Sequence, residues 1–112
     1  MLMNYTKPSL DATADDVAAA KEGDLWGAYT KALVDAGVLV SGEALHPSHT
    51  ATTVRITNGV QDLHDGPYTD SKEQFGGFYV IEVPDLDAAL MWASRNPAAA
   101  SGAVEVRPVV SF

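Results

Sequence analysis

Residues 64–68, with the sequence HDGPY, hold the densest group of side chains in this chain that could do chemistry. A histidine beside a carboxylate can act as an acid–base pair, and a tyrosine can donate a hydrogen bond to a bound molecule. We therefore predict His64 and Asp65 as catalytic candidates and Tyr68 as a ligand-binding residue. A structural alternative stays open, because Asp-Gly-Pro is also a common composition for a tight turn whose carboxylate bonds nearby amides.

Two arginines that interrupt apolar strands are candidate anchors for an anionic ligand. Arg55 lies in the segment TTVRIT and Arg107 in VEVRPV. A guanidinium can hold a carboxylate through two parallel hydrogen bonds. The alternative is that these arginines form ion pairs with Glu82 and Glu105 inside an interface, because an unpaired buried charge costs several kcal/mol. Trp26 is predicted to line the ligand pocket, with core packing as its alternative.

Composition excludes several classes of partner and cofactor. The chain has no cysteine, and its three histidines show no spacing typical of a metal site, so we expect no metal and no cofactor. Seven basic against fifteen acidic residues give a formal charge of −8, which disfavours nucleic-acid binding. The sequence shows neither a signal peptide nor the ~20 apolar residues of a membrane helix, so we expect a cytoplasmic protein without membrane contact.

The length of 112 residues and 46% hydrophobic content predict one globular domain over residues 1–112. Within it, Asn58-Gly59 is a strong signal for a two-residue hairpin turn. Apolar residues alternate with polar ones on both sides of this turn, which is typical of half-buried strands. The predicted strands span residues 1–5, 38–45, 52–57, 60–64, 77–83 and 104–112.

Two helices are predicted between these strands. The first covers residues 13–36, with a break expected near Gly23 because glycine weakens a helix by roughly 1 kcal/mol relative to alanine. The second covers residues 85–96 and is expected to end at Pro97. The residues expected to face the core are Leu25, Tyr29, Ala32 and Ala36 on the first helix, and Leu86, Leu90 and Ala93 on the second.

The order of strands and helices predicts an α+β fold of the ferredoxin-like sandwich type with an extra β-hairpin. Helices would then cover one face of the sheet. The segment FYVI at residues 78–81 places large apolar groups on both faces of one strand, where a one-sided sheet would alternate. Something must therefore cover the open face, and a second copy of the chain is the simplest candidate, since two-fold dimers are the commonest oligomers.

The sequence resembles the DGPF subgroup of the YCII-related (YciI-like) proteins. The matching stretches are DGPY at residues 65–68, KEQ at 72–74 and GGFY at 76–79, supported by residues 37–43, 52–55, 84–89 and 104–109. Together they extend from about Gly27 to Val110, whereas residues 1–23 match poorly. The resemblance implies a ferredoxin-like fold that dimerises into an α/β barrel. YciI-like members carry a histidine on the first helix, and its position here corresponds to Trp26.

These observations support two hypotheses for function. In the first, the chain is a small bacterial homodimer that binds an unknown small molecule in a pocket at the dimeric α/β barrel, with or without acid–base, lyase-like activity. In the second, it is a non-catalytic binding or regulatory module. The resemblance adds a link to sigma-factor-associated transcription for the second, because some relatives are fused to sigma factors or encoded beside them. The sequence does not decide whether the chain is an enzyme.

Overall fold

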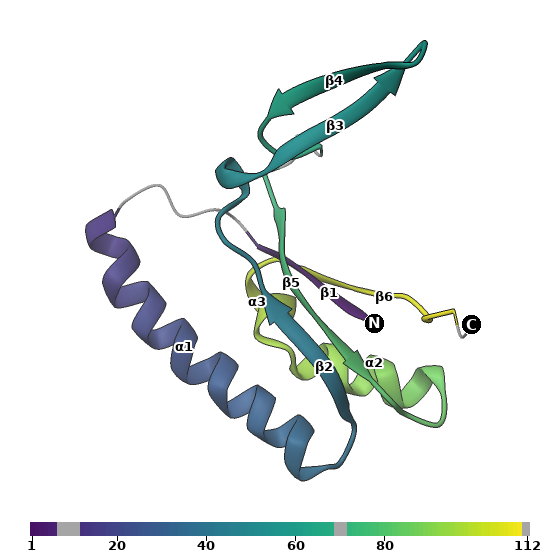
Figure 1. The fold of residues 1–112 in the computed structure, drawn as a ribbon. Coiled ribbons are helices and arrows are strands. Elements are labelled where there is room, and N and C mark those ends of the chain that lie inside the picture. The colour runs from purple at the N-terminus through teal and green to yellow at the C-terminus, as the bar shows by residue number, and fades with distance from the viewer. Residues whose placement is uncertain (7–11, 69–71, 111–112) are drawn as a thin grey trace.

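The structure is a computed structural model that describes residues 1–6, 12–68 and 72–110, with the backbone alone for residues 12–23. Figure 1 shows a sheet covered by helices and a separate hairpin that projects from one end of it. The strands are β1 (Leu2–Thr6), β2 (Leu39–Ala44), β3 (Thr52–Thr57), β4 (Val60–Asp65), β5 (Gln74–Ile81) and β6 (Ala103–Val106). The helices are α1 (Ala12–Asp35), the 3₁₀ turn η1 (Ser48–Thr50), α2 (Leu86–Arg95) and α3 (Pro97–Ser101).

The main sheet has the strand order β2-β5-β1-β6, and each neighbouring pair is antiparallel. Strands β3 and β4 form a second, two-stranded sheet. This mixed α+β arrangement is consistent with the predicted ferredoxin-like sandwich and its extra hairpin. Strand β1, at the poorly matching end of the sequence, lies in the centre of the sheet between β5 and β6. No helix in the described residues is long and apolar enough to cross a membrane.

The core lies between the sheet and the helices. Leu2 of β1 and Leu33 of α1 have no exposed surface, and they pack with Tyr29, Trp92 and Ala93. The register pairs Leu2 with Tyr79 of β5 and with Val106 of β6, so these side chains share the face that the helices cover. This cluster joins α1, α2 and the two central strands into one hydrophobic unit.

Part of the predicted helix packing is wrong. Leu86 and Leu90 are 61% and 46% exposed, Leu25 on α1 is 60% exposed, and Ala36, just after α1, is exposed as well. On α2 the buried residues are Ala89, Trp92 and Ala93, because the large indole ring occupies the inward position and turns the leucine stripe toward solvent.

Several element ends also differ from the prediction. The expected break near Gly23 is absent, since α1 is continuous over its 24 residues. The second helix begins as predicted, with the Asp85 carboxylate accepting a hydrogen bond from the Ala88 amide at 2.8 Å. Pro97 does end α2, but it also begins α3, which the sequence analysis missed. Strand β6 stops at Val106, well before the predicted end at residue 112, and residues 111–112 lie outside the described residues.

Two buried asparagines hold α3 against β1. The Asn96 side-chain amide donates to the Asn4 side-chain oxygen at 2.8 Å, and the Asn96 oxygen accepts from the Ala98 amide at 2.9 Å. Asn4 and Asn96 are 6% and 2% exposed. Because a buried polar group is costly without a partner, these bonds fix the junction between the two helices and the sheet.

The Tyr29 hydroxyl makes a hydrogen bond that crosses the core. It donates to the Trp92 carbonyl at 2.7 Å and so ties α1 to α2. The Tyr29 ring contacts Trp26, Tyr79 and Trp92 edge to face. Burial raises the pKa of Tyr29 to about 12, against a smaller opposing effect of its hydrogen bond with the Asn96 side chain.

This raised pKa predicts a loss of stability in alkali. The unfolded chain releases the Tyr29 proton near pH 10 and the folded chain near pH 12, so the stabilisation is complete below pH 10 and is lost as the pH rises toward 12. We expect the wild type to lose about 2 kcal/mol more than Tyr29→Phe over this range. Urea denaturation of both proteins at pH 8 and pH 11.5 measures the difference. Equal losses in the two proteins would contradict it.

Among the described residues, the helices all pack on one face of the main sheet, and none covers the second face. Met3 pairs with Phe78 and with Glu105, so these three side chains point away from the helices. Val80 and the Tyr5–Phe75 pair continue this face. All of these residues are only half-buried. The strand FYVI therefore does place Tyr79 and Ile81 in the core and Phe78 and Val80 on the uncovered side, as predicted. We call this side the open face.

Candidate functional site at the hairpin base

The β3–β4 hairpin positions the side chains singled out in the sequence. Its turn has Asn58 and Gly59 at φ 53° and 77°, as the Asn-Gly signal predicts. From this turn the register pairs Arg55 with Asp62 and Thr53 with His64. Directly opposite residues share a face, so the arginine, the histidine and Asp62 point to the same side of the hairpin.

The Asp-Gly-Pro turn follows directly on the end of β4, which stays in regular register with β3 as far as Asp65. Gly66 has φ 114°, a conformation that side chains disfavour, and it is buried. Its amide donates to the Ala51 carbonyl at 2.7 Å, and its carbonyl accepts from the Thr53 hydroxyl at 2.9 Å. These bonds close the base of the hairpin, where His64 and Asp65 both line one concavity.

This charged concavity has a volume of about 540 Å³. The Arg55 guanidinium carbon lies 5.9 Å from the centre of the Tyr68 ring, a cation–π arrangement. Neither of the ion pairs formed between described residues involves Arg55, which leaves its N–H groups able to bind a ligand. The lining residues are Thr53, Arg55, Asp62, His64, Asp65, Gly66, Pro67 and Tyr68.

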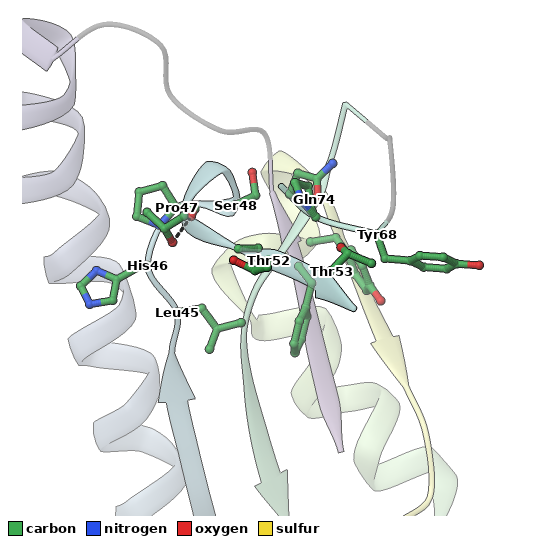
Figure 2. Close-up of a pocket in the computed structure, with 13 residues that line it drawn as sticks. Leu45, His46, Pro47, Ser48, Thr52, Thr53, Tyr68 and Gln74 are labelled. Carbon is green, nitrogen blue, oxygen red and sulfur yellow. Dashed lines mark hydrogen bonds between the residues drawn. The ribbon is translucent and has the colours of Figure 1, made fainter. Parts of the chain in front are cut away.

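A second, more apolar concavity of about 630 Å³ adjoins the first (Figure 2). Tyr5 and Phe75 of the open face form one wall, with ring centres 5.7 Å apart. Leu45 and Pro47, in the segment between β2 and β3, line it from another side, and Tyr68 extends outward from the hairpin base. Thr53, Pro67 and Tyr68 are common to both concavities. A molecule with an apolar body and a polar head would match this pair of surfaces.

Two comparisons with known proteins bear on the identity of the chain. A YCII-related domain matches residues 1–112. The chain belongs to the YCII-related family. The uncharacterized protein R00369 of Rhizobium meliloti (strain 1021) is 37% identical to it over 89 residues, which cover 76% of this chain and 70% of the relative.

In this YCII-related protein the hairpin base brings together four of the six predicted site residues. His64, Asp65, Arg55 and Tyr68 all line the charged concavity. Both His64 and Asp65 are exposed, and no hydrogen bond between described residues joins their side chains. The turn is held by main-chain atoms and by Thr53, so the Asp65 carboxylate is not used to close it.

The other two predicted site residues lie elsewhere in the YCII-related fold. Arg107 follows the edge strand β6 and forms an ion pair with Glu105 at 2.9 Å. Trp26 stacks on Tyr79 with ring centres 6.2 Å apart, on the side of the sheet that the helices cover. Neither residue lines the two concavities at the hairpin base. Their predicted roles in ligand binding stay predictions.

The apolar concavity of this YCII-related chain was not predicted from its sequence. Its walls come from the segment 45–51, from β1 and from the start of β5. The Leu45 amide donates to the Gly76 carbonyl at 2.9 Å, which brings this segment beside β5. In the sequence, Pro47 indicates a turn in this segment, and in the structure it precedes the 3₁₀ turn, but a turn does not by itself predict a concavity. Among the described residues, no group of three or more histidine or acidic side chains could hold a metal ion.

Proposed function

We propose that this protein binds a small organic carboxylate at the hairpin base. The observation that carries the proposal is the placement of Arg55, His64 and Tyr68 on one charged concavity that adjoins an aromatic one. The guanidinium would hold the carboxylate through paired hydrogen bonds, and the apolar body would contact Tyr5 and Phe75. Asp62 and Asp65 on the same wall would reject a ligand with several negative charges.

Acid–base catalysis is the second candidate. It is favoured by one observation, that His64 and Asp65 both line the same concavity although they are adjacent in a strand. A histidine there could move a proton on a ligand held by Arg55, as a lyase-like reaction requires. The exposure of both side chains favours binding without catalysis, so binding is the primary proposal.

We also propose that the protein belongs to the DGPF subgroup of the family and forms a homodimer through the open face. The support for the subgroup is the Asp65-Gly66-Pro67-Tyr68 turn. The support for the dimer is the apolar and uncovered side of the main sheet, where Met3, Phe78 and Val80 are half-buried. Two such faces packed together would enclose an α/β barrel. A cysteine-free chain of this kind suits the cytoplasm, which we propose as its location.

A thermal-shift screen with small aliphatic and aromatic carboxylates tests the binding proposal. We expect at least one compound to raise the melting temperature of the wild type, and Arg55→Ala to weaken its binding 10- to 100-fold. That loss corresponds to about 1.5–3 kcal/mol for a charge-assisted hydrogen-bond pair. Titration calorimetry with the selected compound measures the change.

Lys31→Ala is the matched control, because it removes one positive charge from an exposed helix position whose only ion pair is with Asp35 at the surface. The control should bind the compound as the wild type does. The binding proposal would be overturned if no carboxylate stabilised the wild type, or if Arg55→Ala and the wild type bound with equal affinity.

A further inference from the structure

The β3–β4 hairpin, residues 52–65, stands away from the rest of the chain (Figure 1). We call it the arm. The radius of gyration of the chain is 16.0 Å, whereas about 13 Å is usual for a compact domain of this length. The extents of 47 × 44 × 18 Å describe a broad, thin molecule rather than a sphere. The arm therefore enlarges the outline of the chain without adding to its core.

The two faces of the arm differ in character. Val54 pairs with Leu63, and Ile56 lies on the same face. These three side chains are 55%, 60% and 66% exposed, so nothing in the described chain covers them. The other face carries Arg55, Asp62 and His64 together with two threonines and one apolar residue, Val60. Such alternation is typical of a sheet that buries one face, and a two-stranded hairpin is marginally stable without that burial.

The open face alone is small for a stable interface. Its four strands, spaced about 4.8 Å apart and about 19 Å long on average, present a flat patch of about 360 Å². A stable interface buries roughly 800 Å² of accessible surface on each partner, a quantity that exceeds the planar area of the same patch because side chains project from it. One face of the arm would add a patch of about 200 Å² from each copy. A dimer that used both surfaces would come much closer to the usual size.

The arm also adjoins the open face directly. The apolar concavity is lined on one side by Tyr5 and Phe75 of the open face and on the other by Thr53 and Tyr68 of the hairpin base. A second copy seated on the open face would therefore reach the root of the arm. The face of the arm that carries Val54, Ile56 and Leu63 also holds the uncharged residues Thr52 and Gln61, and its one acidic residue, Asp65, lies at the hairpin base, where it lines the charged concavity.

We propose that the arm packs its apolar face, Val54, Ile56 and Leu63, against a second copy of the chain, extending the interface beyond the edge of the main sheet. This inference rests on the dimer proposed above. By two-fold symmetry each copy both gives and receives an arm contact. The concavities at the hairpin base would then lie at the rim of the interface, and the second copy would form part of their surroundings.

Neighbouring lysine substitutions on the two faces of the arm test the inference. Ile56→Lys places a charge on the apolar face, and Thr57→Lys places the same charge on the opposite face one residue later. Sedimentation equilibrium should show at least a hundred-fold weaker dimer for Ile56→Lys and an unchanged dimer for Thr57→Lys. Equal dissociation constants for both variants and the wild type would overturn the inference while leaving the dimer itself intact.

Cysteine labelling provides an independent measurement, because the natural chain has no cysteine. In the dimer, a thiol introduced by Ile56→Cys should react with a maleimide at least ten times more slowly than one introduced by Thr57→Cys. Dilution below the dissociation constant should abolish this difference. Equal rates in a confirmed dimer would contradict the arm contact, whereas a wild type that is monomeric at all concentrations would overturn both the dimer and the arm.

Discussion

Replacing Leu33 by alanine is expected to lower the free energy of unfolding by about 2–5 kcal/mol. Leu33 has no exposed surface and packs with Leu2 and Trp92 at the centre of the only core that the described residues form. The substitution removes buried methyl groups and leaves a cavity that the rigid aromatic neighbours cannot fill. Urea denaturation at a fixed protein concentration measures the change, since association would couple stability to concentration.

Val34→Ala is the matched control for this prediction. Val34 follows Leu33 on α1 and is 57% exposed, so its truncation should change the stability by no more than about 0.5 kcal/mol. A variant of Leu33 that is as stable as the variant of Val34 would show that α1 does not pack on the sheet through this face.

Phe78→Glu is expected to dissociate the proposed dimer. Phe78 lies on β5 beside Met3, near the middle of the open face. In a two-fold interface the substitution buries two unpaired carboxylates, each at a cost of several kcal/mol. We expect the dissociation constant to rise at least a thousand-fold, which corresponds to about 4 kcal/mol. Sedimentation equilibrium of the variant and the wild type measures this change.

The control adds the same charge on the helix side of the molecule. Val34→Glu places a carboxylate on the exposed surface of α1 and should leave the dissociation constant within about three-fold of the wild type. Circular dichroism of Phe78→Glu checks that the monomer keeps its fold. An unchanged dissociation constant in a folded Phe78→Glu protein would exclude the open face as the interface.

The hairpin shows how much of the site the sequence could predict. The Asn58-Gly59 turn was predicted from the sequence, and in the structure this two-residue turn pairs Thr53 with His64 and Arg55 with Asp62. The order of elements likewise predicted the mixed α+β fold and its one-sided layer of helices. These features depend on local turn chemistry and hydrophobic alternation, which the sequence carries directly.

The features that were predicted wrongly or not at all have a common physical origin. The leucines of α2 predict its buried face, but in the structure Trp92 packs with Leu2 and Leu33 beside the correctly predicted Ala93, and Leu86 stays exposed. Which side chains fill a core depends on shapes brought together from distant segments, and periodicity alone does not contain that information.

The apolar concavity was missed for the same reason. It exists because segment 45–51 bonds to Gly76 and lies beside Tyr5, a residue 40 positions or more away in sequence. Trp26 and Arg107 were grouped with the hairpin residues by chemical type, and the fold places them on other surfaces. Residue type alone suggests which side chains could bind a ligand, but the topology decides which of them lie close together.

The proposed interface and the arm contact both depend on the claim that two copies associate through the open face. Light scattering of the wild-type chain, separated by size at several micromolar concentrations, tests this claim most directly. We expect a mass near twice 11.8 kDa, about 24 kDa, and a shift to the single-chain mass for Phe78→Glu. A wild-type mass of 11.8 kDa throughout that range would contradict it.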